Sequence, residues 1–317
     1  MRKTCLNTVY ELAQKDERIF FIGSDLSFET LKEFKENIPD RFFMEGVSEA
    51  NVVGMAAGLA LSGKIVYINT IATFFSRRAY EQIVLDLCLH NVNVRLLNNG
   101  GGLVYAPLGP THLAIEDIGI MRTIPNMTIV APADADEMKR LIIESVDYQG
   151  PIYIRFGKGY DPIVTTDDVP FKIGKAFGYR NGRDALILTT GITLQLGLEA
   201  SDALKREGLN VSVLHVPTVK PLDAKTILDY VGKASVVVTV EEHTVIGGLG
   251  SAIAEVMAEA NFGSSKKFRR IGIPDVFAKQ YGSQKDLMES YGISTENIIS
   301  TIKQLQKTTN KAHSEAR

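Results

Sequence analysis

The stretch FMEGVSEANVVGMAAGLALSG, residues 43–63, places an acid, Glu49, just ahead of a run of small and apolar residues. A helix with apolar residues on every side is typically buried nearly all round. In one interpretation Ser48 caps this helix and Glu49 lies in its first turn, where the helix dipole favours a negative charge. In the other, the carboxylate is partly desolvated and can share a proton with a ligand nitrogen.

Around this stretch, short apolar runs alternate with helix-length amphipathic segments. This alternation predicts a mostly parallel sheet covered on both faces by helices. The predicted strands are RIFFIG (18–23), KIVYIN (64–69), NVRLLN (93–98), MTIVAP (127–132) and PIYIRF (151–156). The predicted helices cover residues 4–14, 49–63, 77–90 and 135–149.

The same alternation restarts in the second half of the chain, after a turn-rich stretch that we expect to be a linker at 166–182. Apolar runs near 185, 210, 235 and 268 alternate there with predicted helices at 193–206, 223–232 and 247–260. The sequence therefore predicts two consecutive α/β domains, 1–165 and 183–306. The polar residues 307–317 are expected to be a disordered tail.

Composition narrows the class of protein. The 317 residues carry a net charge of −2 and only short Lys/Arg clusters, which argues against a nucleic-acid or membrane surface. Cys5 and Cys88 lie far apart without metal-ligand spacing and are expected to pack as small apolar residues. No apolar run reaches membrane-spanning length, so a cytoplasmic soluble protein is the expectation.

The segment TFFSRRAYEQIVLDL (73–87) sits where a strand gives way to a helix, the place where open α/β sheets bind ligands. One of Phe74 and Phe75 is expected in the core, and the other could stack on a planar ligand ring. Arg77 and Arg78 are either solvated or hold an anion.

Two further segments could carry chemistry. His112 lies in the glycine-rich loop segment NNGGGLVYAPLGPTHLAIED (98–117), where a histidine could donate or accept a proton. In IRFGKG (154–159), Arg155 and Lys158 are either surface cations or a clamp for a substrate anion. A third glycine-rich segment, VEEHTVIGGLG (240–250), lacks G-x-G-x-x-G and is expected to be a tight turn rather than a phosphate site.

Taken in order, six segments resemble the pyrimidine-binding and C-terminal domains of transketolase-type enzymes that depend on thiamine diphosphate. They are FMEGVSEANVVGMAAGLA, RAYEQIVLDL, GPTHLAIEDI, RTIPNMTIVAPADADEM, VKPLD and TVEEHTVIGGLGSAIAEV, and the likeness runs from about residue 5 to 305. RAYEQ and VEEHTVIGGLG are most similar to transketolases and 1-deoxyxylulose-5-phosphate synthases.

The resemblance implies roles for individual residues. Glu49 would hydrogen-bond the N1′ atom of the cofactor's aminopyrimidine. Phe75 would stack on that ring, and Phe74 and Arg78 would lie in the same pocket. His112 would donate to a substrate oxygen. Arg155 or Lys158 would bind the anionic end of the substrate.

The resemblance also implies a partner. Full-length relatives hold Mg²⁺ and the diphosphate with a G-D-G segment and a downstream Asn, and this sequence contains no such pattern. We therefore expect one half of a split transketolase, whose N-terminal partner subunit supplies the metal ligands. An α2β2 assembly is the expected form.

Two departures from the family lie in the glycine-rich loop. Leu108 stands where relatives have an aspartate that contacts a substrate hydroxyl, and Gly100 or a neighbour stands where transketolases have a histidine. Losing polar contacts should change which sugars are accepted.

Three alternatives to ketol transfer from a ketose to an aldose stay open. They are a 1-deoxyxylulose-phosphate-synthase-like activity that decarboxylates pyruvate, the β subunit of a 2-oxo acid dehydrogenase, and a non-catalytic scaffold. RAYEQ and GPTH argue against the dehydrogenase, and the retention of Glu49, Phe75 and His112 argues against the scaffold.

Overall fold

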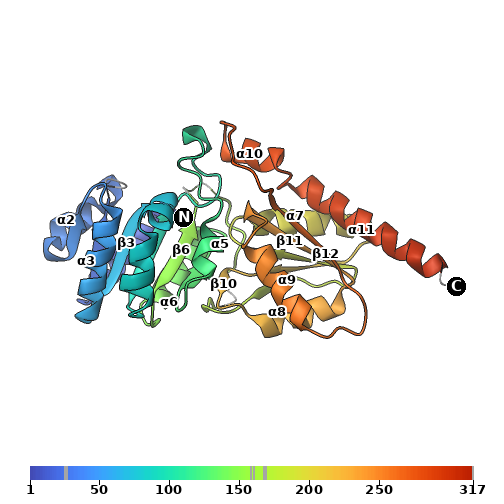
Figure 1. The fold of residues 1–317 in the computed structure, drawn as a ribbon, viewed down its shortest axis with the longest axis horizontal. Helices are drawn as coiled ribbons and strands as arrows, with labels where there is room; N and C mark the ends of the chain where they lie inside the picture. The colour runs from blue at the N-terminus through green and yellow to red at the C-terminus, as the bar shows by residue number, and fades with distance from the viewer. Residues whose placement is uncertain (25–27, 158, 160, 167–169, 316–317) are drawn as a thin grey trace.

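Two α/β units lie side by side in the computed structural model, each built on its own sheet (Figure 1). The structure describes residues 1–24, 28–157, 159, 161–166 and 170–315. The first sheet has seven strands in the order β10-β5-β6-β4-β3-β1-β2, and the second has five in the order β12-β11-β8-β9-β7. All pairings are parallel except those of the edge strands β10 and β7. The predicted fold class is confirmed.

The first sheet has buried, apolar strands, as expected for a parallel sheet covered on both faces. Its strands are β1 (Ile19–Gly23), β2 (Phe42–Met44), β3 (Ile65–Ile71), β4 (Val94–Asn99), β5 (Thr128–Val130), β6 (Ile152–Phe156) and β10 (Thr218–Lys220). Its helices are α1 (Arg2–Ala13), α2 (Lys32–Asn37), α3 (Glu49–Leu61), α4 (Tyr80–Gln82), α5 (Asp117–Arg122) and α6 (Ala135–Ser145). Short 3-10 turns are η1 (Phe28–Leu31), η2 (Pro39–Arg41) and η5 (Ala106–Leu108), and π-helical turns are η3 (Phe74–Arg78) and η4 (Ile83–Cys88).

Helices α1 and α6 cover one face of this sheet, and α3, η3, η4 and α5 cover the other. Cys5 and Cys88 are buried free thiols in these two cores, as predicted. The segment predicted as one helix at 77–90 is broken by its π-helical turns. Helix α3 also differs from the expectation, because only one side of it is buried. Gly54 and Gly58 are exposed, and Leu61 is 63% exposed.

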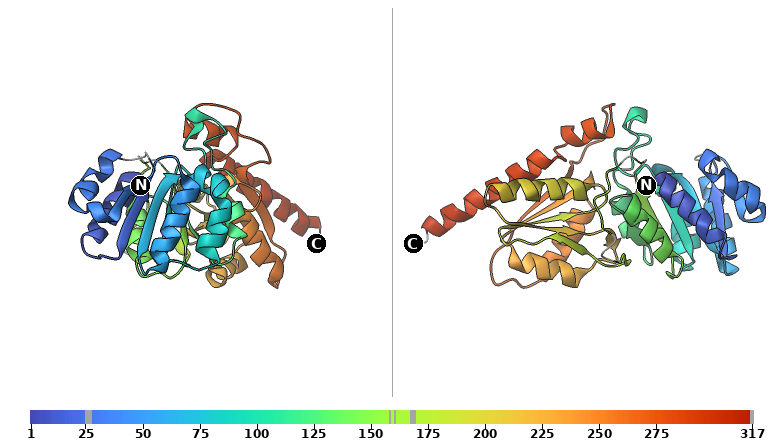
Figure 2. Two further views of the ribbon diagram at one scale, coloured as in Figure 1. Left: turned by 60° about the vertical axis from the view of Figure 1, so that its left-hand side comes forward. Right: turned by 180° about the vertical axis from the view of Figure 1, so that it is seen from behind.

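The second unit packs α7 and α11 on one face of its sheet and α8 and α9 on the other, as the reverse view shows (Figure 2). Its strands are β7 (Phe177–Arg180), β8 (Ala185–Thr189), β9 (Val211–His215), β11 (Val236–Thr244) and β12 (Lys267–Ile273). Its helices are α7 (Thr193–Arg206), α8 (Ala224–Lys233), α9 (Leu249–Glu259), α10 (Gln284–Ser290) and α11 (Thr295–Glu315).

The boundaries between the units differ from the expected ones in three places. Strand β7 lies inside the expected linker at 166–182, because its backbone pairs with β9. Strand β10 follows β9 in the chain but pairs with β5 at the edge of the first sheet. Helix α11 continues to Glu315, so residues 307–315 extend a helix where a disordered tail was expected.

The glycine-rich loop joins the two units. Its residues Leu103, Leu113 and Ile115 belong to the same apolar core as Ile187 and Val238 of the second sheet. Burial of these side chains fixes the loop between the units. Within the described ranges, no helix is both long and apolar enough to cross a membrane.

Candidate active site

Glu49 is the first residue of α3 and is only 3% exposed. One of its carboxylate oxygens, Oε2, accepts a hydrogen bond from Arg78 Nη1 at 2.8 Å. Ser48 occupies the cap position, but its side chain makes no capping bond and its hydroxyl donates to the carbonyl of Glu45 at 2.9 Å. The interpretation in which the Ser48 side chain caps the helix is therefore wrong, although Glu49 does lie in the first turn, and its carboxylate has an arginine as its charged partner.

Arg78 links Glu49 to two rings. Its guanidinium lies 4.5 Å from the centroid of the half-buried Phe74 ring, within cation–π range. The Phe74 ring meets the His112 ring edge-on, with 5.4 Å between centroids. Glu49, Arg78, Phe74 and His112 thus follow one another in contact, and we call these four residues the Glu49–His112 row. They come from three segments: the start of α3, the turn η3 and the glycine-rich loop.

Phe75 does not belong to this row. It has no exposed surface and lies in the core between the first sheet and its helices, beside Val53 and Ile83. Phe75 was expected to be the stacking ring, but in this chain it presents no free surface to a ligand. Phe74 and Phe75 are consecutive residues of the helical turn η3, which follows β3, so their side chains point in different directions. Phe74 is the ring with free surface.

Arg155 is not available to a substrate either. It is buried at the end of β6, where Nε bonds both carboxylate oxygens of Asp117 at 3.1 and 2.9 Å. Its Nη2 donates to the carbonyls of Ala114 at 3.0 Å and Glu242 at 2.8 Å. The ion pair with Asp117 lies within the first unit, and the bond to the carbonyl of Glu242 reaches the second unit. The guanidinium expected as a possible clamp for a substrate anion thus has all these partners within the chain. Lys158, the other candidate, lies outside the described residues.

Asp117 and Arg155 belong to a buried polar network that joins the units. Tyr153 donates its hydroxyl to Asp117 Oδ2 at 2.9 Å, and Glu242 accepts from the amide of Leu103 at 2.7 Å and from Gln284 at 2.8 Å. Burial raises the pKa of the Glu242 carboxyl to about 7, although Arg155 acts to lower it. For Arg155, burial acts to lower the pKa, but the carboxylates of Asp117 and Glu242 raise it overall.

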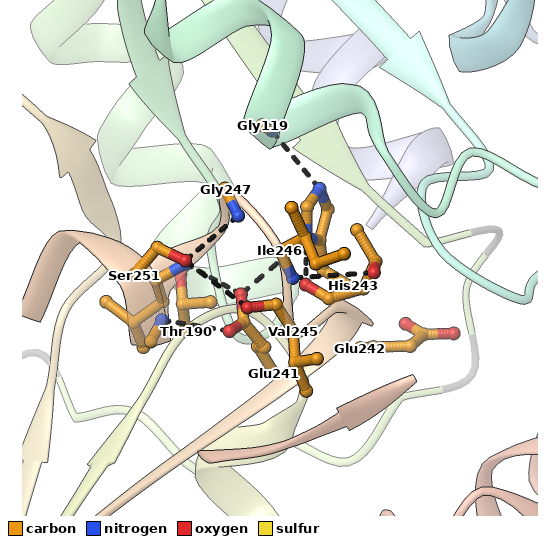
Figure 3. A network of polar contacts seen from close by, with 12 residues as sticks. Gly119, Thr190, Glu241, Glu242, His243, Val245, Ile246, Gly247 and Ser251 are labelled. Atoms are coloured by element: carbon orange, nitrogen blue, oxygen red, sulfur yellow. Dashed lines mark hydrogen bonds and ion pairs between the residues drawn. The ribbon is translucent and has the colours of Figure 1, made fainter. Parts of the chain in front are cut away.

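The neighbouring residues of β11 extend this network into the second unit. Figure 3 shows Glu241 and Glu242 pointing to opposite sides of the strand. His243 accepts from the amide of Gly119 at Nε2, 3.2 Å away, while Nδ1 lies 2.7 Å from the carbonyl of Thr244. This pattern assigns the proton to Nδ1 of a neutral ring, and burial lowers the pKa of His243 in the same sense.

Glu241 explains the glycine-rich turn before α9. Its carboxylate accepts from the first amides of that helix, Leu249 at 2.6 Å and Gly250 at 2.9 Å. Burial raises its pKa to about 7 in spite of these bonds. The helix terminus that could have held a phosphate is occupied by this side chain, so the expected tight turn is confirmed.

The two departures in the glycine-rich loop have different surroundings. Gly100 adopts φ +79°, and a side chain there would collide with the ring of Tyr105. Leu108 lies at the tip of the loop and is 50% exposed. A histidine at Gly100 would therefore require the loop to rearrange.

Polar groups also collect at the carboxyl ends of β3 and β4. Asn69, Asn98 and Asn99 are buried, and each has at least one side-chain atom without a hydrogen-bond partner among the described residues. Unsatisfied buried polar atoms are uncommon and are often found at functional sites. This edge of the sheet therefore keeps hydrogen-bonding capacity that the described chain does not use.

Most of the buried network does not follow from the sequence patterns. No motif points to Asp117, Glu241 or Glu242 as site residues, and none identifies Glu116 as the partner of Arg77. The signal was weak but present, because AIEDIG and VEEHT each place acids next to apolar residues. No three His, Cys, Asp or Glu side chains are grouped as a metal site requires within the part of the chain that the structure describes.

The fold and the Glu49–His112 row together define a two-domain α/β protein with a candidate ligand site at the carboxyl edge of its first sheet. The model of the transketolase pyrimidine-binding domain matches residues 1–160, and that of the transketolase C-terminal domain matches residues 174–298. The chain therefore belongs to the transketolase family.

Relatives and a solved structure extend this match. The chain is 36% identical to a 6-deoxy-6-sulfo-D-fructose transketolase subunit of Clostridium sp., over 94% of this chain and 92% of that one. It is 35% identical to one subunit of an apulose-4-phosphate transketolase of Phocaeicola vulgatus, over 96% and 97%. A structure described as a split gene transketolase, inactive beta4 tetramer, superposes with a TM-score of 0.88 at 34% identity, over 96% and 98%.

Proposed function

We propose that this chain is the catalytic C-terminal subunit of a two-chain transketolase. It would transfer a two-carbon ketol unit from a ketose to an aldose. The observation that carries the proposal is the Glu49–His112 row, in which a buried acid, a cation, a half-buried aromatic ring and a histidine follow one another in contact. Membership of the transketolase family supports this reaction class.

The row fits the pyrimidine half of thiamine diphosphate. A ring nitrogen needs a buried acid as its partner, and Glu49 is one. A planar ring needs an aromatic face, and Phe74 has free surface where Phe75 has none. When bound, the cofactor would supply the nucleophilic carbon and the electron sink for breaking the C–C bond.

The side chains of this chain would then do three things. Glu49 would hold a hydrogen bond to the pyrimidine nitrogen, with Arg78 fixing its carboxylate. Phe74 would support the pyrimidine ring. His112, whose ring lies 5.4 Å from that of Phe74, would donate a proton to a substrate oxygen.

A separate partner chain is part of the proposal. The two relatives are called subunits in their names, and the chain matches both along nearly their whole length. We infer that a separate N-terminal subunit carries the Mg²⁺ ligands and the diphosphate site. An α2β2 assembly would bring two copies of each chain together.

The proposed donor is a ketose with an anionic end, phosphorylated or otherwise charged. One relative is named for a sulfonated ketose and the other for a phosphorylated one. Since Arg155 is paired with Asp117, Lys158 is the remaining candidate of the two expected cations.

Replacing Glu49 by Gln in the reconstituted complex tests this function. Loss of the acid should lower ketol transfer by about 100-fold or more, the usual contribution of a positioned proton-transfer group. Glu11→Gln on the exposed side of α1 is the control and should leave the rate unchanged. Wild-type turnover by Glu49→Gln would show that the catalytic assignment is wrong. Release of CO₂ from pyruvate by the wild-type complex would favour the synthase-type activity instead.

A further inference from the structure

The side chain of Arg77 holds the loop that carries His112. Its Nη2 donates to the carbonyl of Leu113 at 2.9 Å, and its Nη1 to the carbonyl of Pro110 at 3.3 Å. Its Nε pairs with the carboxylate of Glu116. Pro110 precedes His112 in the chain and Leu113 follows it. One guanidinium group therefore bonds the backbone on both sides of the histidine.

Other residues of the loop are held from the second unit and from β6. The amide of Leu103 bonds Glu242, and the carbonyl of Ala114 accepts from Arg155. Between these attachments the loop reaches its tip, where Leu108 is half exposed. Close to the histidine, the local bond from the His112 amide to the carbonyl of Gly109 at 3.0 Å is reinforced by the two bonds from Arg77.

Arg77 and Arg78 are neighbours in the chain but serve different groups. Arg78 contacts Glu49 and the ring of Phe74, the residues of the proposed cofactor pocket. Arg77 contacts backbone atoms of the loop and one acid of that loop. Loss of Arg78 should therefore affect cofactor binding, and loss of Arg77 should affect the substrate step.

We propose that Arg77 is a positioning residue that fixes His112 for contact with the substrate. The role of His112 in this proposal rests on the proposed function. The contacts of Arg77 with Pro110, Leu113 and Glu116 do not depend on it. An arginine suits this task because its planar fork presents several N–H groups in fixed directions. A lysine has one flexible ammonium group and would reach the carbonyls less well.

Hydrogen exchange on the full chain tests whether Arg77 holds the loop around His112, and this measurement does not require catalysis. Arg77→Gln should speed exchange of the backbone amides at 109–116 and leave those of the second sheet unchanged. Arg180→Gln is the matched control, because Arg180 is 41% exposed against 39% for Arg77 and also pairs with an acid, Asp202. Unchanged exchange at 109–116 in Arg77→Gln would overturn the proposal.

Kinetics of the reconstituted complex test the consequence. Arg77→Gln should lower kcat for ketol transfer by about tenfold, since a group misplaced by an ångström can cost about 100-fold. Affinity for thiamine diphosphate should stay at the wild-type value, and Arg77→Lys should recover part of the rate. Reduced cofactor affinity with an unchanged kcat would contradict a positioning role.

A double variant decides whether Arg77 acts through His112. If it does, Arg77→Gln should have little further effect in a His112→Ala background. Additive losses would overturn the proposal. A wild-type complex without ketol transfer would instead refute the proposed function, and the exchange result would still decide whether Arg77 holds the loop.

Discussion

Phe74 and Phe75 are identical side chains in adjacent positions with opposite surroundings. Phe75 is fully buried in the core of the first unit, whereas Phe74 lies half-buried between Arg78 and His112. Their substitution should therefore separate stability from cofactor binding.

Phe75→Ala should lower the free energy of unfolding of the chain by about 3–5 kcal/mol, because it removes a large side chain from a packed core. Phe74→Ala should change the unfolding free energy much less and should weaken thiamine diphosphate binding in the reconstituted complex. Denaturant unfolding and cofactor titration measure the two effects. The reverse pattern would return Phe75 to the stacking role.

The sequence identifies the pair of rings but not which ring faces the site. Side-chain direction at this point depends on a π-helical turn that begins at the end of β3, and apolar spacing does not reveal such a turn. Arg155 is a similar case. Its partner Asp117 lies 38 residues away in the chain, so a local pattern shows a cation at a strand end and nothing of its ion pair.

At the scale of elements, β11 carries three consecutive buried ionisable side chains, Glu241, Glu242 and His243. Each contacts a different segment: the start of α9, the glycine-rich loop and the amide of Gly119 in α5. Strand β11 thus makes hydrogen bonds to the start of α9, to the glycine-rich loop and to α5 of the first unit.

Glu242 should make stability depend on pH. Burial raises its pKa from 4.5 to about 7, so the folded chain holds the proton more tightly than the unfolded chain does. At a pH below 4.5, the pKa of this carboxyl in the unfolded chain, its protonation contributes fully to the free energy of unfolding. That contribution is lost as the pH rises to about 7, the pKa in the folded chain. We expect the melting temperature of wild type to fall between pH 5.5 and 7.5, in part through this group.

Glu242→Gln should reduce that fall, because the amide has no proton to lose, and calorimetry at the two pH values measures it. Glu259→Gln, on the exposed side of α9, is the control and should keep the wild-type slope. An unchanged slope in Glu242→Gln would show that this carboxyl does not titrate with folding in this range. Glu241 should keep part of the fall in melting temperature with pH in both variants, since burial raises the pKa of its carboxyl as well.

Element positions were predictable where the pattern was long and regular. The range predicted for α7, 193–206, is the one observed, and both sheets follow from the alternation of apolar runs. The short strands β2, β7 and β10 were not predicted, because three or four residues give too little periodicity.

At the scale of the whole molecule, the Glu49–His112 row would form only one wall of a cofactor site. We expect the isolated chain to show little affinity for thiamine diphosphate, since the diphosphate and Mg²⁺ would be held by the partner. Titration calorimetry with and without the partner chain measures this. Tight, Mg²⁺-dependent binding by this chain alone would contradict the split-enzyme proposal.

Strand β10 has a consequence for how this protein is made. The other six strands of the first sheet precede the second unit in the chain, but the open side of β5 is not covered until Thr218–Lys220 have been synthesised with part of the second unit. An uncovered strand edge readily pairs with another chain. A nascent or truncated polypeptide that stops at the linker would therefore be prone to aggregate. A chimaera that transfers the first unit to another protein must include β10 to complete the sheet.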